Sequence, residues 1–254
     1  MIDIEEYTSI REIRLAHPPA NALGPELVRA LSAAVTEAPA AGARGIILSG
    51  APGMFSAGLD VPALLSLDRP AVRTFWRDFV ALICALADAP IPVAAAITGH
   101  SPAGGAVLAL CCDYRVMAEG GYKIGLNEVR VGLPLPAVLF EALAHVVGHR
   151  KAALLGGEGR LLDPGQALTT GFVDELAPAD DVVPQARQWL ESVLALPPHA
   201  YSETRRRTRA PLRRAMADAA VAPAIDAIAD SWCHDDTQAI LHRVVADLRD
   251  KKKR

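Results

Sequence analysis

The stretch Ile97-Thr-Gly-His-Ser-Pro-Ala-Gly-Gly-Ala-Val-Leu-Ala-Leu-Cys-Cys-Asp113 decides how this chain folds. It begins where an apolar run, residues 92–97, reaches a glycine, and it continues through a corner of small residues into a second apolar run with helical spacing. We therefore expect a strand, a tight turn at Gly104 and Gly105, and a helix that begins there. Free N–H groups at the start of a helix favour developing negative charge, and glycine lets a ligand approach the backbone closely.

Two interpretations of this corner are open. Its small residues can serve only to pack a helix closely against a strand, or the Gly104 N–H can be one donor of an oxyanion hole. Another corner favours the oxyanion hole: Met54-Phe-Ser-Ala-Gly-Leu-Asp60 follows a predicted strand at residues 45–49 through the turn residues 50–53. Because it comes earlier in the chain, we call it the first corner and the Gly104 corner the second. Two such corners can direct two backbone donors at one oxygen atom, as an enolate requires.

Composition narrows the class of protein. The chain has 254 residues, of which 51% are hydrophobic, and this length suits one α/β core with an appended helical part. A net charge of −3 gives no reason to expect nucleic acid or an anionic membrane as a partner. The four cysteines contain no CxxC pair, so we interpret them as reduced core residues and expect no metal site. The acidic N-terminus lacks a targeting pattern, and no apolar run is long enough to span a membrane, which predicts a cytoplasmic protein.

Strand and helix patterns alternate along the first two thirds of the chain. We expect strands at residues 8–15, 45–49, 92–97, 114–118 and 172–176. We expect helices after Gly24-Pro25 and at residues 70–88, 137–147, 163–171, 182–196, 200–219 and 224–248. Strands that alternate with helices imply βαβ units and a parallel sheet. We therefore predict an α/β core over residues 1–196 and a helical C-terminal subdomain over residues 197–254.

Three motifs together resemble the crotonase (enoyl-CoA hydratase/isomerase) superfamily. They are Phe55-Ser-Ala-Gly-Leu-Asp60, the Gly104-Gly105 corner with Cys112-Asp-Tyr-Arg115, and Gly125-Leu-Asn-Glu128. Residues 102–132 and Gly148-His-Arg150 are most similar to short-chain Δ3,Δ2-enoyl-CoA isomerases of that superfamily. The resemblance extends over nearly the whole chain, from Pro19-Ala-Asn-Ala-Leu23 to the last helix. It implies a crotonase-like (ββα) spiral core with a helical C-terminal trimerisation subdomain.

The resemblance assigns the chemistry to one carboxyl group. Glu128 falls on the glutamate that isomerases of the family keep, whereas the other glutamate of the hydratases falls on Val107. Adding water across a double bond needs two groups, but moving a double bond needs only one that takes a proton from C2 and returns it to C4. The expected reaction is therefore the isomerisation of 3-enoyl-CoA to trans-2-enoyl-CoA. Without the resemblance, Glu128 beside Arg130 would be interpreted as one end of a surface ion pair.

The same resemblance places the oxyanion donors at the N–H groups of Leu59 and Gly104. It implies contacts with the coenzyme A thioester from these two residues and from Ser56, Ala57, Gly58, Asp60 and Asn127. From the residues alone, Asp60 is a helix cap, and Asn127 either binds substrate or orients Glu128. Asp113 and Arg115 are interpreted as structural, and His100 as a structural group and not a metal ligand.

The remaining expectations concern partners. The family packs its C-terminal helices into trimers, so we expect a homotrimer or a dimer of trimers. Coenzyme A is part of the substrate, and no separate cofactor is expected. The basic runs Arg205-Arg-Arg-Thr-Arg209 and Lys251-Lys-Lys-Arg254 are interpreted as solvated faces and a frayed tail, or else as cations near the phosphates of coenzyme A. Two rival functions stay open: another reaction through the same enolate, such as hydration or decarboxylation, and a non-catalytic acyl-CoA-binding trimer.

Overall fold

The central stretch forms a strand, a second short strand and a helix: β5 (Val93–Ile97), β6 (Gly99–Pro102) and α4 (Gly104–Leu110). The structure is a computed structural model that describes residues 1–252 and the side chains of residues 1–247. In it, β5 belongs to a six-stranded sheet of order β1-β2-β3-β5-β7-β9, which is parallel except for the pair of β1 and β2. Strand β6 lies between β4 and β8 in a smaller parallel sheet. The predicted α/β architecture with a parallel sheet is confirmed.

The other elements have the following bounds. The large sheet also contains β1 (Ile2–Tyr7), β2 (Ile10–Leu15), β3 (Gly45–Ser49), β7 (Tyr114–Ala118) and β9 (Glu175–Ala177). The small sheet also contains β4 (Gly53–Met54) and β8 (Ile124–Gly125). The helices before residue 160 are α1 (Pro25–Glu37), α2 (Val61–Leu64), α3 (Arg69–Asp88), η1 (Glu128–Val131), α5 (Ala137–Val147) and α6 (His149–Glu158). The later helices are α7 (Pro164–Thr170), η2 (Ala179–Asp181), α8 (Val182–Leu194), α9 (Pro198–Thr208), α10 (Ala210–Ala219), α11 (Ala222–Trp232) and α12 (Asp235–Lys252).

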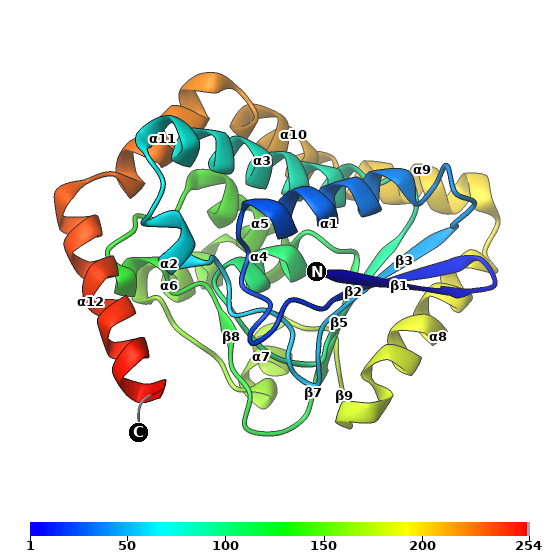
Figure 1. Ribbon diagram of the computed structural model, residues 1–254. Helices are drawn as coiled ribbons and strands as arrows, with labels where there is room; N and C mark the ends of the chain where they lie inside the picture. Colours follow the sequence, from blue (N-terminus) through cyan, green and yellow to red (C-terminus); the bar gives the residue numbers. More distant parts are fainter. Residues whose placement is uncertain (253–254) are drawn as a thin grey trace.

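The central strands are apolar because both faces of the large sheet are covered. In β3, Ile46 and Leu48 face the main core, while Ile47 faces a second cluster built with Leu190 of α8. All five residues of β3 and all five of β5 are buried. Helices α1, α3, α4 and α5 lie on one side of the sheet and α8 on the other (Figure 1). Parallel strands that are buried on both faces lose the polar alternation of a half-exposed strand.

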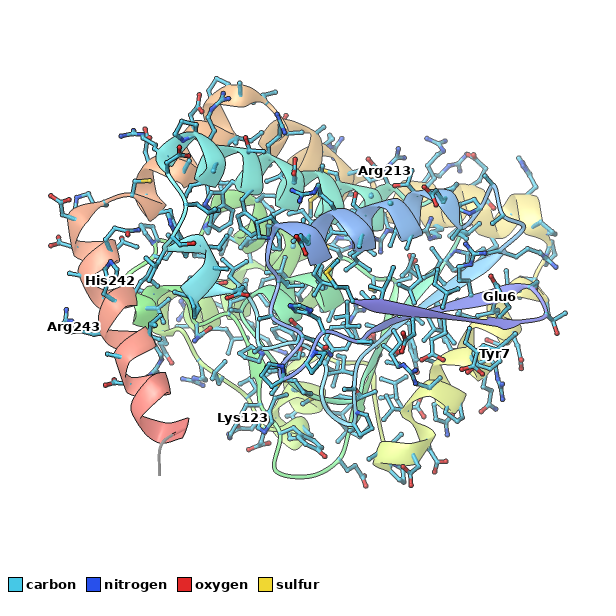
Figure 2. The ribbon with its side chains drawn as sticks, in the orientation of Figure 1. Glu6, Tyr7, Lys123, Arg213, His242 and Arg243 are labelled. Carbon is cyan, nitrogen blue, oxygen red and sulfur yellow. The ribbon has the colours of Figure 1, made fainter. Side chains whose placement is uncertain are left out.

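The N-terminal hairpin was missed in part. The predicted strand at residues 8–15 is β2, but β1 precedes it and pairs with it from Ile2 to Tyr7. Four of the six residues of β1 are exposed, and its acidic side chains pair across the hairpin, as in Asp3 with Arg14 at 2.8 Å. Glu6 and Tyr7 lie near the turn of this hairpin (Figure 2). An edge strand held by surface ion pairs carries little hydrophobic periodicity from which it could be predicted.

The two longest helices predicted for the C-terminal part are each broken. Residues 200–219 form α9 and α10 with Arg209 between them, because Pro211 lacks an N–H and its ring is incompatible with a continuous helix. Residues 224–248 fall in α11 and α12, which Cys233 and His234 separate. The sequence reasoning also missed α6 and placed β9 about three residues too early.

The C-terminal helices pack onto the core of the same chain. Helix α10 contacts α3 and α5, α11 contacts α3, and α12 contacts α2 and the turn η1. Ion pairs join α3 to this layer, among them Arg73 with Asp226 and Arg69 with Asp230. The division at residue 196 and assembly into trimers stay predictions. Within residues 1–252, no helix is both long enough and apolar enough to cross a bilayer.

Candidate active site

The two glycine corners meet at the small sheet. Residues Gly53 and Met54 of β4 pair with Gly99 and His100 of β6. A Cβ atom built on Gly58 would lie 3.1 Å from the Gly104 nitrogen, and one built on Gly104 would lie 3.3 Å from the Gly58 Cα. The corners therefore approach each other backbone to backbone, at a distance that only glycine permits. The two corners are therefore adjacent in the fold, and the use of their N–H groups as oxyanion donors stays a prediction.

Each corner has backbone N–H groups without a partner in the described part of the chain: Leu59 in the first, and Gly104, Gly105 and Ala106 at the start of α4 in the second. In the first corner, Gly58 N–H donates to the Ser56 hydroxyl at 3.2 Å and Asp60 N–H donates to Leu23 O at 3.2 Å. Leu59 N–H lies between them and donates to no protein atom within residues 1–252. The Gly104 N–H, the first of α4, is likewise without a protein acceptor there. Unbonded backbone N–H groups on two adjoining corners can donate hydrogen bonds to a ligand.

The second corner contains a residue with a strained backbone conformation. Ala103, directly before α4, has φ of 46° and ψ of −121°, a conformation that non-glycine residues rarely adopt. It is held by its N–H, which donates to Gly125 O of β8 at 2.8 Å, and by its carbonyl, which accepts from Val107 N–H at 3.0 Å. Strain of this kind persists where surrounding contacts enforce it, and it is frequent at functional sites.

The first corner is supported by Asn21, a residue to which sequence reasoning assigned no role. Its side-chain amide donates to Met54 O at 3.2 Å and to Phe55 O at 3.0 Å, and its own carbonyl accepts from the Ser56 hydroxyl at 2.7 Å. Asn21 has a positive φ of 50°, which asparagine tolerates better than most residues. The motif Pro19-Ala-Asn-Ala-Leu23 contained this signal. The sequence alone does not show that Asn21 contacts Met54, Phe55 and Ser56, which lie 33 to 35 positions later.

The other residues predicted at this corner have structural partners. The Ser56 side chain is fully buried, and its hydroxyl is used within the chain. Asp60 accepts a hydrogen bond from Ala63 N–H at 3.1 Å, which confirms it as the N-cap of α2. His100 accepts from Lys123 N–H through Nδ1 at 3.2 Å, as expected of a structural histidine.

Glu128 begins the turn η1, three residues after the end of β8. Strand β8 pairs with β6, which leads to the Gly104 corner. Its side chain is 7% exposed, and its Oε2 atom has no hydrogen-bond partner in the described structure. Burial raises the pKa of this carboxyl group to about 7. Arg130 turns away and donates to the carbonyls of Glu158 and Gly159 at 2.9 and 2.7 Å. The interpretation of Glu128 as one end of a surface ion pair is therefore wrong.

Two further residues bear on the chemistry expected of Glu128. Asn127 precedes it, and the Oδ1 atom of this amide is buried without a partner within the described residues. Val107 is fully buried one turn into α4. An unpaired buried acceptor is unusual in a folded protein and marks a place where a ligand or water can bond. A buried carboxyl group and a buried amide thus lie side by side with unused hydrogen-bonding capacity.

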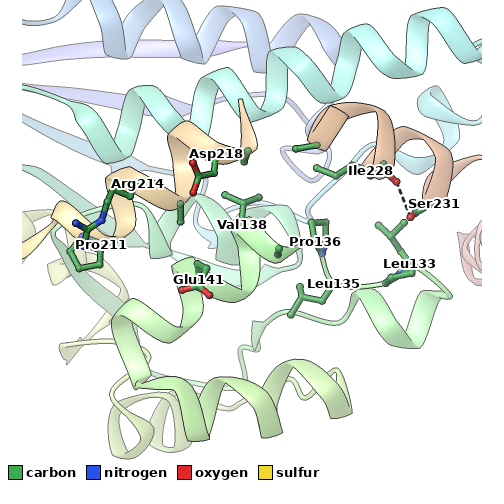
Figure 3. Close-up of a pocket in the computed structure, with 16 residues that line it drawn as sticks. Leu133, Leu135, Pro136, Val138, Glu141, Pro211, Arg214, Asp218, Ile228 and Ser231 are labelled. Atoms are coloured by element: carbon green, nitrogen blue, oxygen red, sulfur yellow. Dashed lines mark hydrogen bonds between the residues drawn. The ribbon is translucent and has the colours of Figure 1, made fainter. Parts of the chain in front are cut away.

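An apolar groove of about 660 Å³ begins at the loop that follows Glu128. Leu133 lines one end of it together with Ser231 of α11, and Pro211 and Arg214 of α10 line the other end (Figure 3). The loop is tied to the site because Leu133 N–H donates to Glu128 O at 3.0 Å. It is tied to α12 because the Thr237 hydroxyl donates to Gly132 O at 2.7 Å. The lining of the groove comes from three separate segments of the chain, so sequence analysis did not predict the groove.

The basic run at residues 205–209 is not a solvated face throughout. Arg206 and Arg207 are exposed, but the side chains of Arg205 and Arg209 are 12% and 7% exposed and both pair with Asp113. The expectation of a solvated run is wrong for these two residues, because α9 packs one side of the run onto the core. Asp113 and Arg115 are structural, as expected: Arg115 pairs with Asp174 at 2.8 Å. The side chains of the run at residues 251–254 lie outside the described residues.

Comparison with known proteins agrees with this geometry. Residues 5–239 match the family model described as "Enoyl-CoA hydratase/isomerase". "Enoyl-CoA delta isomerase 1, mitochondrial" of Mus musculus is 33% identical over 258 residues, covering 99% of this chain and 88% of that protein. "Probable enoyl-CoA hydratase echA17" of Mycobacterium avium is 36% identical over 190 residues, covering 73% of this chain and 72% of that one.

Solved structures give the same result for the fold. The crystal structure of human mitochondrial delta3-delta2-enoyl-CoA isomerase superimposes with a TM-score of 0.94 at 28% identity, covering 99% of both chains. The probable enoyl-CoA hydratase EchA3 of Mycobacterium tuberculosis superimposes with a TM-score of 0.82 at 30% identity, covering 91% of this chain and 95% of that one. The predicted crotonase-like fold is confirmed. This chain belongs to the enoyl-CoA hydratase/isomerase (crotonase) family.

Proposed function

We propose that this protein is a Δ3,Δ2-enoyl-CoA isomerase that converts 3-enoyl-CoA into trans-2-enoyl-CoA. Its substrate is an acyl-CoA thioester, and the reaction needs no cofactor beyond the coenzyme A of the substrate. The isomerases among the relatives support this choice. The observation that carries it is the state of Glu128, which is buried with an unpartnered oxygen. The resemblance to the family adds that the position of the hydratases' other glutamate holds Val107, which is also buried.

The reaction follows from one base and two backbone donors. The ionised Glu128 carboxylate takes a proton from C2. The electrons of that C–H bond form a C1–C2 double bond, and the C=O pair of the thioester moves onto its oxygen while the C3–C4 double bond stays in place. The resulting dienolate oxygen accepts hydrogen bonds from Leu59 N–H and Gly104 N–H. The oxygen pair then re-forms the C=O bond, the C1–C2 pair moves to C2–C3, and the C3–C4 pair takes the proton of Glu128 at C4. One carboxyl group within reach of both carbons is sufficient, so a net proton is neither gained nor lost.

The remaining predicted site residues have supporting roles in this proposal. Asn127 offers its buried, unpartnered Oδ1 to a substrate group or to the protonated form of Glu128. Ser56, Ala57, Gly58 and Asp60 hold the first corner so that Leu59 N–H faces the thioester oxygen. The groove that begins at Leu133, whose N–H donates to the Glu128 carbonyl, would take the acyl chain. The assay that tests the proposal compares the purified protein on 3-hexenoyl-CoA and on crotonyl-CoA.

The isomerase should depend on pH through Glu128. Its pKa is raised from 4.5 to about 7, and only the ionised form accepts the C2 proton. We therefore expect kcat/KM to rise between pH 6 and pH 8 by roughly tenfold, as for one group of pKa near 7. The measurement is the initial rate with 3-hexenoyl-CoA at subsaturating concentration over pH 5–9. A flat profile between pH 5 and pH 8 would contradict the assignment, because a carboxyl group of ordinary pKa is fully ionised there.

Replacing Val107 tests why the protein is not a hydratase. Val107→Glu should raise the hydration of crotonyl-CoA above the wild-type background by about tenfold, less than the factor of about 100 or more that a well-placed acid–base group contributes. The gain is limited because Val107 is fully buried, and burial favours the protonated form of an introduced carboxyl group. Val107→Gln is the matched control of similar shape without a carboxylate. Equal hydration by both variants would show that the missing carboxylate is not the obstacle.

A further inference from the structure

The guanidinium groups of Arg115, Arg205 and Arg209 lie around the C-terminal end of α4, the helix that begins with Gly104. Helix α4 is only seven residues long, so the unpaired groups at its two ends lie close together. At its C-terminal end, the carbonyls of Cys111 and Cys112 are buried and have left the helical hydrogen-bond pattern. Buried carbonyls need partners, and here arginine side chains supply them.

Arg209 supplies these partners from the C-terminal helices. It lies between α9 and α10, and its guanidinium donates to Cys111 O at 2.6 Å, to Cys112 O at 3.2 Å and to Ala87 O at the end of α3 at 3.3 Å. It also pairs with Asp113 at 3.1 Å. In the sequence, Arg209 is 97 positions from Cys112, 98 from Cys111 and 122 from Ala87. One buried side chain thus joins the appended helices to the end of α4 opposite Gly104.

Arg205, one helical turn earlier, makes a different set of contacts. It forms a two-point ion pair with Asp113 at 2.8 and 2.9 Å and donates to Ala89 O at 2.6 Å. It therefore shares the carboxylate with Arg209 but bonds none of the carbonyls at the end of α4. Arg115 donates to Cys112 O at 2.9 Å and to Ala109 O of α4 at 3.4 Å, but it reaches Cys111 O in no hydrogen bond within the described residues. Arg209 is the arginine that connects Cys111 O to the rest of the molecule.

Both ends of α4 are thereby fixed. At the N-terminal end, Gly104 lies against Gly58 with almost no free space. At the C-terminal end, the Arg209 contacts set how far the helix can shift along its axis, and a cation there also favours the helix dipole. Protein interiors are close-packed and transmit small displacements. A shift of α4 would move the Gly104 N–H relative to the Leu59 N–H. The two N–H groups can donate to the same oxygen only at a suitable separation.

We propose that Arg209 is a positioning residue for the reaction: by holding the C-terminal end of α4, it places the Gly104 N–H against the thioester oxygen. This inference rests on the proposed function. The C-terminal helices then contribute to catalysis within the same chain, in addition to any part they have in assembly. Arg209 itself touches neither substrate nor Glu128.

The test compares Arg209→Met with Arg205→Met. Both variants remove a buried guanidinium and leave Asp113 one arginine partner, so general losses of stability and charge are matched. We expect Arg209→Met to lower kcat for 3-hexenoyl-CoA by about tenfold or more, since a misplacement of about 1 Å can cost on the order of 100-fold. Its KM should change by less than about threefold, because the hydrogen bonds to the oxygen strengthen in the transition state. Arg205→Met should keep kcat within about twofold of the wild type at a temperature where both variants are folded.

A second readout needs no turnover. Hexanoyl-CoA labelled with carbon-13 at the thioester carbonyl reports hydrogen bonding to its oxygen through the carbonyl stretching frequency in an infrared difference spectrum. The band should move to lower frequency on binding to the wild type and to Arg205→Met, and less so on binding to Arg209→Met. Arg209→Lys, which keeps the charge with fewer donors, should lie between, and it serves in place of Arg209→Met if that variant does not fold.

The outcomes separate this inference from the proposed function. Equal kcat and an equal band shift in the wild type and in Arg209→Met, or equal losses in Arg205→Met and Arg209→Met, would overturn the positioning role and leave the isomerase proposal standing. A wild-type protein that isomerises no 3-enoyl-CoA would instead overturn the proposed function. In that case a band shift that depends on Arg209 and not on Arg205 would still support the positioning of the Gly104 N–H.

Discussion

Glu128→Gln should lower kcat for 3-hexenoyl-CoA by about 1,000-fold or more. A general acid–base group typically contributes a factor of about 100 to 10,000, and here the same carboxyl group serves both proton transfers. The amide keeps the size and most of the hydrogen-bonding shape of the side chain but cannot accept the C2 proton. The rate is followed by the ultraviolet absorbance of the conjugated thioester product.

The controls for this variant separate chemistry from binding and folding. Affinity for hexanoyl-CoA, measured by calorimetry, should stay within about threefold of the wild type, since the thioester contacts are retained. Stability should not fall. Because the pKa of Glu128 is raised in the folded state, ionisation of this group destabilises the native protein as the pH rises from 4.5 to about 7, and glutamine removes that effect. A variant that keeps more than about a tenth of the wild-type kcat would mean that another group is the base.

Gly58→Ala should lower kcat by about 100- to 1,000-fold, the usual loss when an oxyanion donor is removed. A Cβ atom on Gly58 would lie 3.0 Å from Ala103 Cβ and 3.1 Å from both the Gly104 nitrogen and Pro102 O. Two of these contacts are with backbone atoms, which cannot move aside as a flexible side chain can. The two corners must therefore separate, and the Leu59 and Gly104 amides can no longer bond one oxygen.

Gly171→Ala is the matched control. Gly171 has a φ of 78°, close to the 88° of Gly58, but a Cβ atom there meets nothing within 4 Å. Both variants carry the strain of a positive φ, on the order of 1 kcal/mol, whereas only Gly58→Ala forces the corners apart. The melting temperature should fall in both variants and further in Gly58→Ala, where overpacking adds to the strain, and kcat at a temperature where both are folded should fall only in Gly58→Ala. A similar kcat in both variants would contradict the claim that catalysis depends on the close approach of the two corners.

The parts of the fold that sequence analysis predicted correctly have strong local signals. The buried strands β3 and β5 are continuous apolar runs between turn residues, and α3 repeats its apolar residues at helical spacing. The corner at Gly104 was located because an apolar run ends at a group of small residues that leads into a second apolar run with helical spacing. Glu128 was singled out by the resemblance, since its isolation from cations is a property of the folded chain. The sequence Glu128-Val-Arg130 alone does not indicate that the Arg130 side chain bonds other carbonyls instead of Glu128.

What sequence analysis missed depends on contacts between distant segments. Arg205 and Arg209 belong to a run that is typical of a solvated surface, and only the packing of α9 onto Asp113 buries them. Asn21 supports the first corner from more than 30 residues away. The groove beginning at Leu133 joins a loop with two helices of the C-terminal part. Each of these features exists only after long-range pairing, which residue patterns within a short window do not encode.

The central claim is that one carboxyl group and two backbone amides make this chain an isomerase and not a hydratase. The measurement that tests it most directly is the ratio of two rates for the purified wild-type protein: isomerisation of 3-hexenoyl-CoA and hydration of crotonyl-CoA, each at saturating substrate. The account predicts that isomerisation is faster by a factor of about 100 or more, because hydration lacks the second acid–base group. Hydration as fast as isomerisation, with Val107 in place, would contradict it.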